Sequence, residues 1–344
     1  MGCGGSNLKM DYTLDDGCSV NRANAPHDTY KTNKIKFGNN QHETAYHSWT
    51  PNDGAEKPVG IVCISHGVHE HGLRYYSFAH QLTKVGYVVY AIDHVSHGGS
   101  GNMKDTRGYI ENYQVLIDDF YHFIKYVKEK YDAKTPCFVF AHSMGSLVGT
   151  LTVQKKDDEG NQLDISAIIL SGLPIAPGVD AASPFGVKSL YPVTKLSFFP
   201  SLVAALTAIA PKGDAAPIIF DAIVGNEAAR ESLRRDLIRI DRPLYNKTAY
   251  ELVKMIEVIK TSIPSFNLPF YALHGKGDGI ALPEGSEQFY NNACTPAEEK
   301  RLSIIPDALH EWLHESMSEE YVSKVIEYFD AIIKSKTDAG SNQI

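Results

Sequence analysis

Short apolar runs alternate with longer amphipathic segments along most of the chain. Runs such as Val59–Ser65 and Tyr87–Ile92 are continuously apolar, which is typical of strands buried on both faces of a parallel sheet. The other predicted strands are His42–Thr50, Thr135–Ala141, Ile165–Ser171, Phe270–His274 and Arg301–Ile305. The predicted helices are Tyr75–Val85, 112–131, 145–155, Gly285–Asn291 and Ser318–Ile333. This alternation predicts an α/β fold whose mostly parallel central sheet is covered by helices on both faces.

One segment, Pro174–Pro264, breaks this alternation. It contains several prolines and irregular apolar helices but no convincing buried strand. It follows a predicted strand at the carboxyl edge of the sheet, which is where ligands bind in open α/β sheets. We therefore expect residues 174–264 to form a helical cap insertion, and residues 31–173 and 265–336 to form the core domain.

Four apolar residues of this cap have the spacing of one helix face. They are Leu202, Val203, Leu206 and Ile209. Such a face either lines a pocket for an acyl chain or dips into a membrane, and packing against the core is an equally good interpretation.

Composition limits the class of protein. The 344-residue chain is 43% hydrophobic, which is enough to bury a large core. Its net charge is −8 and it has no block of basic residues, so no nucleic acid partner is expected. The five cysteines are scattered without CxxC spacing, which indicates a reducing compartment and argues against a disulfide framework or a zinc site. Cys63 and Cys137 fall in predicted strands and are expected to be buried, unreactive thiols.

The N-terminus lacks the apolar segment of a secretory signal but carries a lipidation pattern. In the opening MGCGGS, Gly2 fits N-myristoylation, and Cys3 stands where a palmitoyl chain is commonly added. Two acyl chains give stable membrane anchoring, whereas one binds only marginally. We expect residues 1–30 to be a flexible acylated tether at the cytoplasmic face of membranes, or part of a soluble cytoplasmic protein if acylation is absent. Residues 337–344 are expected to be a flexible tail.

The chemistry begins at Ser143. A buried strand runs into the small-residue turn His142-Ser143-Met144-Gly145-Ser146, and a helical pattern follows. This is the arrangement of the nucleophile elbow of α/β-hydrolases, which lifts a serine hydroxyl above the carboxyl edge of the sheet. The chain has Ala141 where the motif usually has glycine. On this pattern Ser143 is the expected nucleophile.

The acid and the base of such a triad follow the serine in chain order, on loops after later strands. Asp278 lies in the glycine-rich loop HGKGD, and His310 lies in a loop after the next strand. We expect His310 to act as the general base and then acid, and Asp278 to fix the imidazole tautomer. Asp307 is the competing acid, although a carboxylate from a different loop is usual. The oxyanion hole is expected to combine the backbone N–H groups of Val68 and Met144.

Five blocks of the sequence resemble the monoacylglycerol lipase family, a group of serine aminopeptidase S33-like hydrolases. The resemblance spans residues 40–335 apart from the cap, with the blocks in the same order throughout. The blocks are HGVHEHGLRYY at His66–Tyr76, DHVSHGGSG at Asp93–Gly101, the AHSMGS elbow, HGKGD and DALHEWLHE.

The resemblance implies an α/β-hydrolase that faces the cytosol and cleaves monoacylglycerols to glycerol and a fatty acid, without cofactor or metal. It also implies that Glu70, Arg74 and a histidine near the triad base place the polar head group. An equally good interpretation of Glu70 and Arg74 is a structural ion pair that orders the oxyanion loop. His314 lies four residues after His310, whereas the family usually shows three. The alternate residues of the His69–His71 triplet are poor metal ligands without a fourth partner.

Other functions share this scaffold. Epoxide hydrolases and dehalogenases carry an aspartate nucleophile, so Ser143 argues against both. Lysophospholipase and acyl-protein thioesterase activities use the same triad, and they stay open because the shape of the cap decides among substrates. The alternative of a different class is a non-catalytic, lipid-binding hydrolase fold, which would have no need of Ser143, Asp278 and His310. A lipid substrate and a membrane surface are the expected partners, and the sequence does not indicate an oligomeric state.

Overall fold

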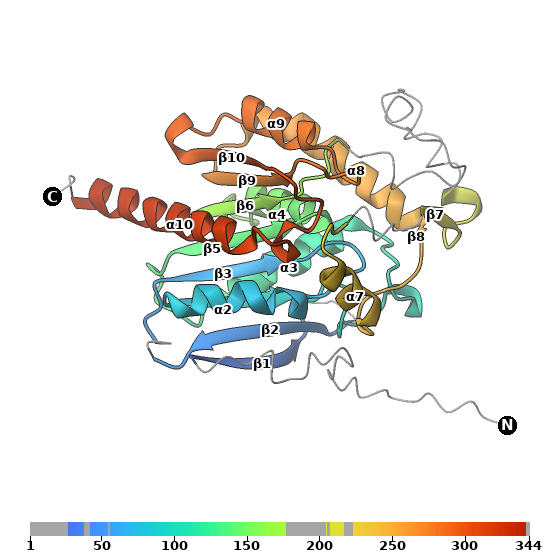
Figure 1. The fold of residues 1–344 in the computed structure, drawn as a ribbon, viewed down its shortest axis with the longest axis horizontal. Helices are drawn as coiled ribbons and strands as arrows, with labels where there is room; N and C mark the ends of the chain where they lie inside the picture. Colours follow the sequence, from blue (N-terminus) through green and yellow to red (C-terminus); the bar gives the residue numbers. More distant parts are fainter. Residues whose placement is uncertain are drawn as a thin grey trace.

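The computed structural model describes residues 27–37, 42–53, 56–176, 204, 207–216 and 223–341. Its centre is an eight-stranded sheet in the order β1-β2-β4-β3-β5-β6-β9-β10 (Figure 1). The strands are β1 Asp28–Ile35, β2 Thr44–Pro51, β3 Gly60–Ser65, β4 Tyr87–Ile92, β5 Cys137–His142, β6 Ala167–Ser171, β9 Phe270–Gly275 and β10 Lys300–Ile305. β2 is antiparallel to both of its neighbours, and the pairs from β4 to β10 are parallel. The predicted α/β class with a mostly parallel sheet is confirmed.

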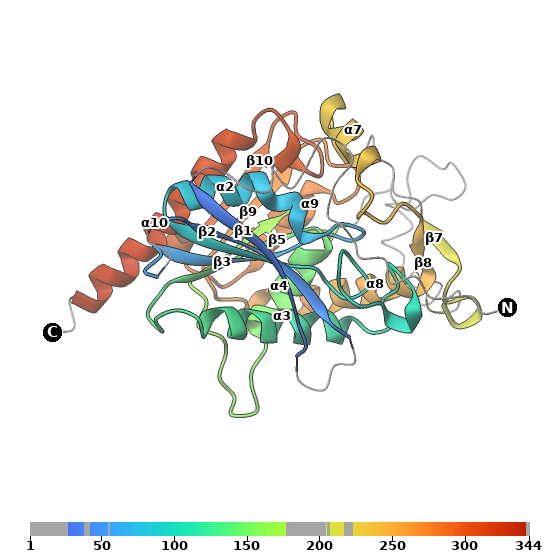
Figure 2. The ribbon, with the colours of Figure 1, turned by 90° about the horizontal axis from the view of Figure 1, so that it is seen from below.

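Helices cover both faces of the sheet (Figure 2). Their bounds are α2 Tyr76–Lys84, α3 Tyr113–Lys128, α4 Met144–Gln154, α7 Glu227–Arg235, α8 Asn246–Ser262, α9 Pro283–Asn292 and α10 Ser318–Ser341. Short 3-10 turns lie at η1 Gly72–Tyr75, η2 Met103–Asp105, η4 Ile263–Ser265, η5 Ala297–Glu299 and η6 Trp312–His314. Side chains of α3, α4, α8 and α9 pack on one face, and side chains of α2 and α10 pack on the other.

The central strands are buried on both sides, which explains their unbroken apolar sequence. In β5, Val139 and Ala141 belong to the core under α3 and α4, whereas Phe138 and Phe140 belong to the core under α2 and α10. Cys63 and Cys137 are buried in this sheet, as predicted. β5 therefore leads the chain through the middle of the molecule to its carboxyl edge.

Three boundaries differ from the prediction. β1 begins at Asp28, inside the segment expected to be a tether, because its largely exposed residues give no apolar signal. α10 continues to Ser341 beyond the predicted end of the core at 336. α8 lies inside the predicted cap range, but it buries Met255, Ile256 and Ile259 in the main core. This helix therefore belongs to a layer of the core rather than to a separate cap.

The described remainder of the cap comprises α7 and a small antiparallel pair, β7 Asp214–Ala216 and β8 Leu244–Tyr245. Ile209 is 85% exposed, while Leu202, Val203 and Leu206 lie outside the described residues. Gly2 and Cys3 also lie outside them. None of the helices in the described ranges combines the length and apolar character that a bilayer span requires.

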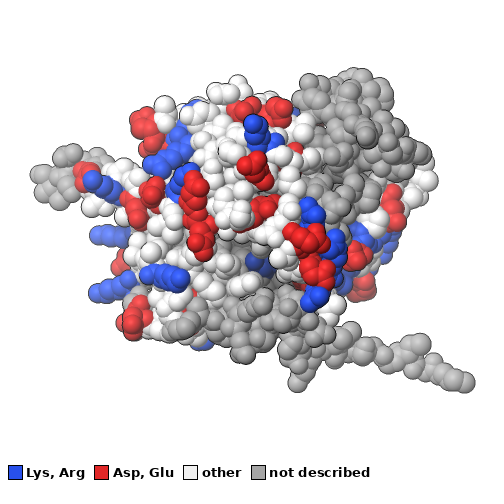
Figure 3. Space-filling view, in the orientation of Figure 1, with Lys and Arg blue, Asp and Glu red and all other residues white. Residues whose placement is uncertain are grey.

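Charges of both signs are interspersed on the face shown in Figure 3. On α7, Arg230 and Arg234 each lie 3.0 Å from a carboxylate oxygen of Glu227. Exposed pairs of this kind contribute at most about 1 kcal/mol to stability. The fold is therefore held by the two apolar layers rather than by its surface ion pairs.

Candidate active site

Ser143 occupies a sharp turn between β5 and α4. Its backbone has φ 52° and ψ −120°, in a region that residues with a side chain rarely adopt. The turn is so tight that a Cβ on Gly145 would lie 2.1 Å from the carbonyl oxygen of Ser65 in β3. Only glycine fits at that position. The predicted strand–turn–helix elbow is therefore present, and its strain is held by close packing between β3 and α4.

The departure at Ala141 has a local explanation. A Cβ on Gly149, in the second turn of α4, would lie 2.9 Å from the Cβ of Ala141. The methyl group that the strand carries therefore occupies the space that a side chain on the helix would need. Gly149 on the helix thus makes room for Ala141 on the strand.

Asp278 and His310 form a buried pair. The carboxylate Oδ2 of Asp278 lies 2.6 Å from Nδ1 of His310. Its other oxygen accepts the backbone N–H groups of Ile280 and Ala281, each at 2.9 Å. A histidine that the sequence did not single out, His274, also lies 3.0 Å from Oδ2 through its Nε2. The backbone N–H groups of this loop and the ring of His274 thus orient the Asp278 carboxylate toward His310.

The electrostatics of the pair favour a charged imidazole. Burial by itself lowers the pKa of His310, but the adjacent Asp278 outweighs burial and raises the pKa above its ordinary value. Burial raises the pKa of Asp278, but His310 and His274 hold it well below its ordinary range. Asp307, the competing acid, is exposed, and its backbone has the left-handed conformation with φ 60°. Asp278 rather than Asp307 is the partner of His310.

Ser143 and His310 both border the carboxyl end of β6. The N–H of Ser143 donates to the carbonyl of Ser171 at 2.9 Å. A Cβ on the next residue, Gly172, would lie 3.1 Å from Cε1 of His310. Gly172 has φ 58°, so its missing side chain allows both the turn and the approach of the imidazole. The structure therefore brings the predicted serine, acid and histidine to one edge of the sheet.

The loop that supplies Val68 lies against the elbow. A Cβ on Gly67 would be 3.2 Å from the Cβ of Ser143. The loop is tied to itself, because the N–H of Gly67 donates to Oε2 of Glu70 at 3.2 Å. Met144 is the first residue of α4, and first-turn N–H groups have no partner inside the helix. The two predicted oxyanion donors thus come from backbone segments that flank the serine.

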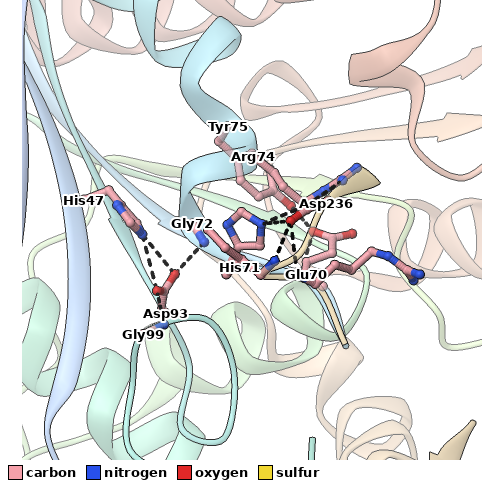
Figure 4. Close-up of polar contacts among 12 residues, drawn as sticks. His47, Glu70, His71, Gly72, Arg74, Tyr75, Asp93, Gly99 and Asp236 are labelled. Atoms are coloured by element: carbon pink, nitrogen blue, oxygen red, sulfur yellow. Dashed lines mark hydrogen bonds and ion pairs between the residues drawn. The ribbon is translucent and has the colours of Figure 1, made fainter. Parts of the chain in front are cut away.

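The side chains of Glu70 and Arg74 are 9% and 8% exposed, and each is held by partners other than the ion pair between them that one interpretation of the sequence offered. Glu70 accepts from the Gly67 N–H and from the Tyr75 hydroxyl at 2.9 Å, so it orders the oxyanion loop. Arg74 donates to Glu311 at 2.6 Å and to Asp236 at 3.4 Å. Figure 4 shows Asp236 reaching in from the cap toward Arg74. Glu70 therefore orders the oxyanion loop as the structural interpretation expected, whereas Arg74 pairs with Glu311 and Asp236 in place of the expected ion pair with Glu70. A role of either residue in placing a head group stays a prediction.

His314, the third predicted head-group residue, ends η6. Its Nε2 lies 3.5 Å from Oε2 of Glu311. Sequence reasoning did not single out Glu311 or His142, although both adjoin predicted triad residues. The ring of His142 lies 4.9 Å from the ring of His310. Their positions next to Ser143 and His310 in the chain were the signal that could have found them.

The DHVSHGGSG block has a structural role. Asp93, at the end of β4, accepts the N–H of Gly72 at 2.6 Å and of Gly99 at 2.8 Å, and it pairs with His47 at 3.2 Å (Figure 4). A Cβ on Gly98 would lie 2.2 Å from its carboxylate. Asp93 thereby joins β2, β4 and η1 beneath the oxyanion loop.

Comparisons with known proteins show the family of the chain. The family model described as serine aminopeptidase S33 matches residues 56–317. The chain belongs to this hydrolase family. An uncharacterised abhydrolase domain-containing protein of Dictyostelium discoideum is 26% identical over 302 residues, which cover 86% of this chain and 29% of that protein. This S33 hydrolase thus spans less than a third of that relative.

Named lipases are among the relatives. Monoglyceride lipase of Rattus norvegicus is 24% identical over 79% of the S33 hydrolase and 80% of its own length. Monoacylglycerol lipase of Mycolicibacterium smegmatis is 25% identical over 78% and 86%. A soluble variant of the Saccharomyces cerevisiae monoglyceride lipase superposes with a TM-score of 0.72 at 19% identity, covering 88% of this chain and 95% of that structure. The fold of this S33 hydrolase is therefore that of an α/β-hydrolase.

Proposed function

We propose that the chain is a serine hydrolase of long-chain fatty-acyl esters, with monoacylglycerol as its principal substrate and glycerol and a free fatty acid as products. The observation that carries the proposal is the 2.6 Å pair of Asp278 and His310 at the sheet edge that also holds Ser143. Support for the substrate comes from the relatives named monoglyceride lipase and monoacylglycerol lipase.

The first half of the reaction forms an acyl-enzyme. Ser143 Oγ attacks the ester carbonyl carbon while its proton passes to Nε2 of His310. Asp278 holds Nδ1 and stabilises the imidazolium that forms. The N–H groups of Val68 and Met144 donate to the carbonyl oxygen as it becomes an oxyanion, an effect worth about 3–4 kcal/mol per donor. The intermediate then expels glycerol, whose oxygen takes the proton from His310.

Water completes the reaction. His310 removes a proton from a water molecule, and the resulting hydroxide attacks the acyl carbon. The second tetrahedral intermediate collapses, the fatty acid leaves and the proton returns to Ser143. The acid, base, nucleophile and oxyanion donors of these steps all come from this chain, and the co-reactant is water.

The proposal extends to the membrane. Acylation of Gly2 and Cys3, which lie outside the described residues, would hold the enzyme at the surface where its lipid substrate resides. Mass analysis of the mature N-terminus after expression in eukaryotic cells tests this part. We expect the masses of one myristoyl and one palmitoyl group, and an unmodified N-terminus contradicts it.

The catalytic part is tested with a fluorophosphonate probe, which labels an activated serine. We expect the full chain to be labelled and Ser143→Ala to remain unlabelled. The matched control is Ser146→Ala, because Ser146 lies in the same turn but donates to the backbone carbonyl of Ser143. A folded wild type that resists the probe favours a non-catalytic, lipid-binding protein.

The substrate is tested with a panel of monoacylglycerols, lysophospholipids and acyl-thioesters of matched chain length. We expect the highest kcat/KM on a monoacylglycerol. A higher value on a lysophospholipid or an acyl-thioester keeps the serine mechanism but replaces the substrate proposed here.

A further inference from the structure

A second group of polar side chains lies behind His310, and the reaction steps above do not use it as an acid, base or nucleophile. Glu70, His142 and Glu311 each offer one potential ligand atom, and these atoms all lie within 4.8 Å of one another. All three side chains are buried. They line a cavity of about 10 Å³, and His314 lies at this cavity with 29% of its side chain exposed. A space of that size holds one water molecule or ion.

One nitrogen in this group lacks a partner. His142 is 3% exposed, and its Nδ1 lies 3.0 Å from Oγ of Ser171. Its Nε2 has no hydrogen-bond partner among the described residues and lies 3.6 Å from Oε1 of Glu70. When Nδ1–H donates to Ser171, the lone pair of Nε2 points into the group of carboxylates. A buried lone pair beside carboxylate oxygens is the arrangement that a metal cation satisfies.

In both Glu70 and Glu311, the oxygen Oε2 accepts hydrogen bonds from neighbouring groups. Oε2 of Glu70 accepts from Gly67 and Tyr75, and Oε2 of Glu311 accepts from Arg74 at 2.6 Å. Together with the bond from Ser171 to His142, these contacts orient each potential ligand. Outer partners of this kind are typical of metal sites, where they fix the orientation of the ligands.

The donor set decides which cation the group suits. Arg74 pairs directly with Glu311 and Asp236, which leaves Glu70 and His142 to face the cavity. A set of one imidazole and two carboxylates suits Zn²⁺, whereas Mg²⁺ and Ca²⁺ prefer oxygen ligands only.

We propose that Glu70, His142 and Glu311 bind Zn²⁺, with water in the fourth position. The ring of His142 lies 4.9 Å from the ring of His310, and Glu311 follows His310 in the chain, so the proposed metal site adjoins the proposed active site. Binding of the ion does not depend on the proposed esterase reaction.

Cobalt(II) chloride added to the full chain tests the binding, because tetrahedral Co²⁺ absorbs visible light with or without activity. We expect a tetrahedral spectrum that zinc chloride abolishes by displacement. Glu311→Gln should weaken cobalt binding by at least about 10-fold. The matched control is His80→Gln, which removes a ligand from a second potential metal-binding group among the described residues, His27, Asp28 and His80. This control should bind cobalt as the wild type does.

Each outcome decides the proposal. No spectrum in the wild type, an unchanged spectrum in Glu311→Gln, or its loss in His80→Gln overturns the site. If Glu311→Gln does not fold, His142→Gln is read in the same way. An enzyme inactive on every ester but with the expected spectrum contradicts the proposed function alone.

Discussion

At the scale of single residues, the choice between two aspartates decides how His310 works. Asp278 is buried and lies 2.6 Å from Nδ1 of His310, whereas Asp307 is exposed three positions before it. Asp278→Asn should fold but lose about 10⁴-fold in kcat, because an amide no longer stabilises the imidazolium or fixes its tautomer. Asp307→Asn should keep its activity. Steady-state hydrolysis of a monoacylglycerol, with thermal unfolding to verify folding, measures both variants. Activity that survives in the first and disappears in the second transfers the acid role to Asp307.

The sequence predicted this site only as far as local patterns extend. Ser143, Asp278 and His310 could be found because each follows a recognisable strand, in the chain order of the hydrolase plan. The partners of Arg74 could not. Asp236 is 162 residues away and Glu311 is 237 residues away, and neither has a local pattern that points to an arginine. Contacts of that separation come from the topology of the sheet.

At the scale of elements, β5 and α4 meet through a pair of small residues, and this contact can be tested by exchange. Gly149→Ala should destabilise the protein by about 1–3 kcal/mol, because its new Cβ would meet that of Ala141 at 2.9 Å. Ala141→Gly added to that variant should recover most of the loss, since it removes the opposing methyl group. Urea unfolding of both single variants and the double variant gives the coupling energy. Strictly additive effects would mean that the two residues do not share this space.

The same physics explains which elements the sequence revealed. β3, β4 and β5 are buried on both faces, so their composition indicated them clearly. β1 is an edge strand with largely exposed side chains, and it pairs only with β2, so its sequence resembles that of a tether. α8 was assigned to the cap because it falls within the insertion, yet its buried face belongs to the core. A strand or helix can be predicted from sequence only when its burial imposes a regular pattern of apolar and polar residues on it.

At the scale of the whole molecule, Asp236 ties the described part of the cap to the core. It lies 2.9 Å from Nε2 of His71 and 3.4 Å from Arg74, both on the oxyanion side of β3 (Figure 4). Its Oδ1 also accepts the N–H groups of Ile238 at 3.0 Å and Arg239 at 3.1 Å. The Asp236 carboxylate thus fixes the backbone of Ile238 and Arg239 after α7 and connects this segment to His71 and Arg74.

Asp236→Asn should therefore cost about 3 kcal/mol at pH 7, because it removes one of the two carboxylates that pair with the buried Arg74 guanidinium. The matched control is Arg234→Gln, which breaks an exposed pair on the neighbouring helix and should change stability by less than about 1 kcal/mol.

Burial raises the pKa of Asp236, but His71 and Arg74 outweigh it and hold the pKa well below its ordinary range. The stabilisation is consequently full above the ordinary aspartate pKa of about 4 and is lost as the pH falls below it. Urea unfolding of wild type and variant should show a difference that is smaller by roughly 0.5–1 kcal/mol at about pH 3.5 than at pH 7. A difference that grows on acidification, or a control as damaging as Asp236→Asn, would mean that the cap is held by other contacts.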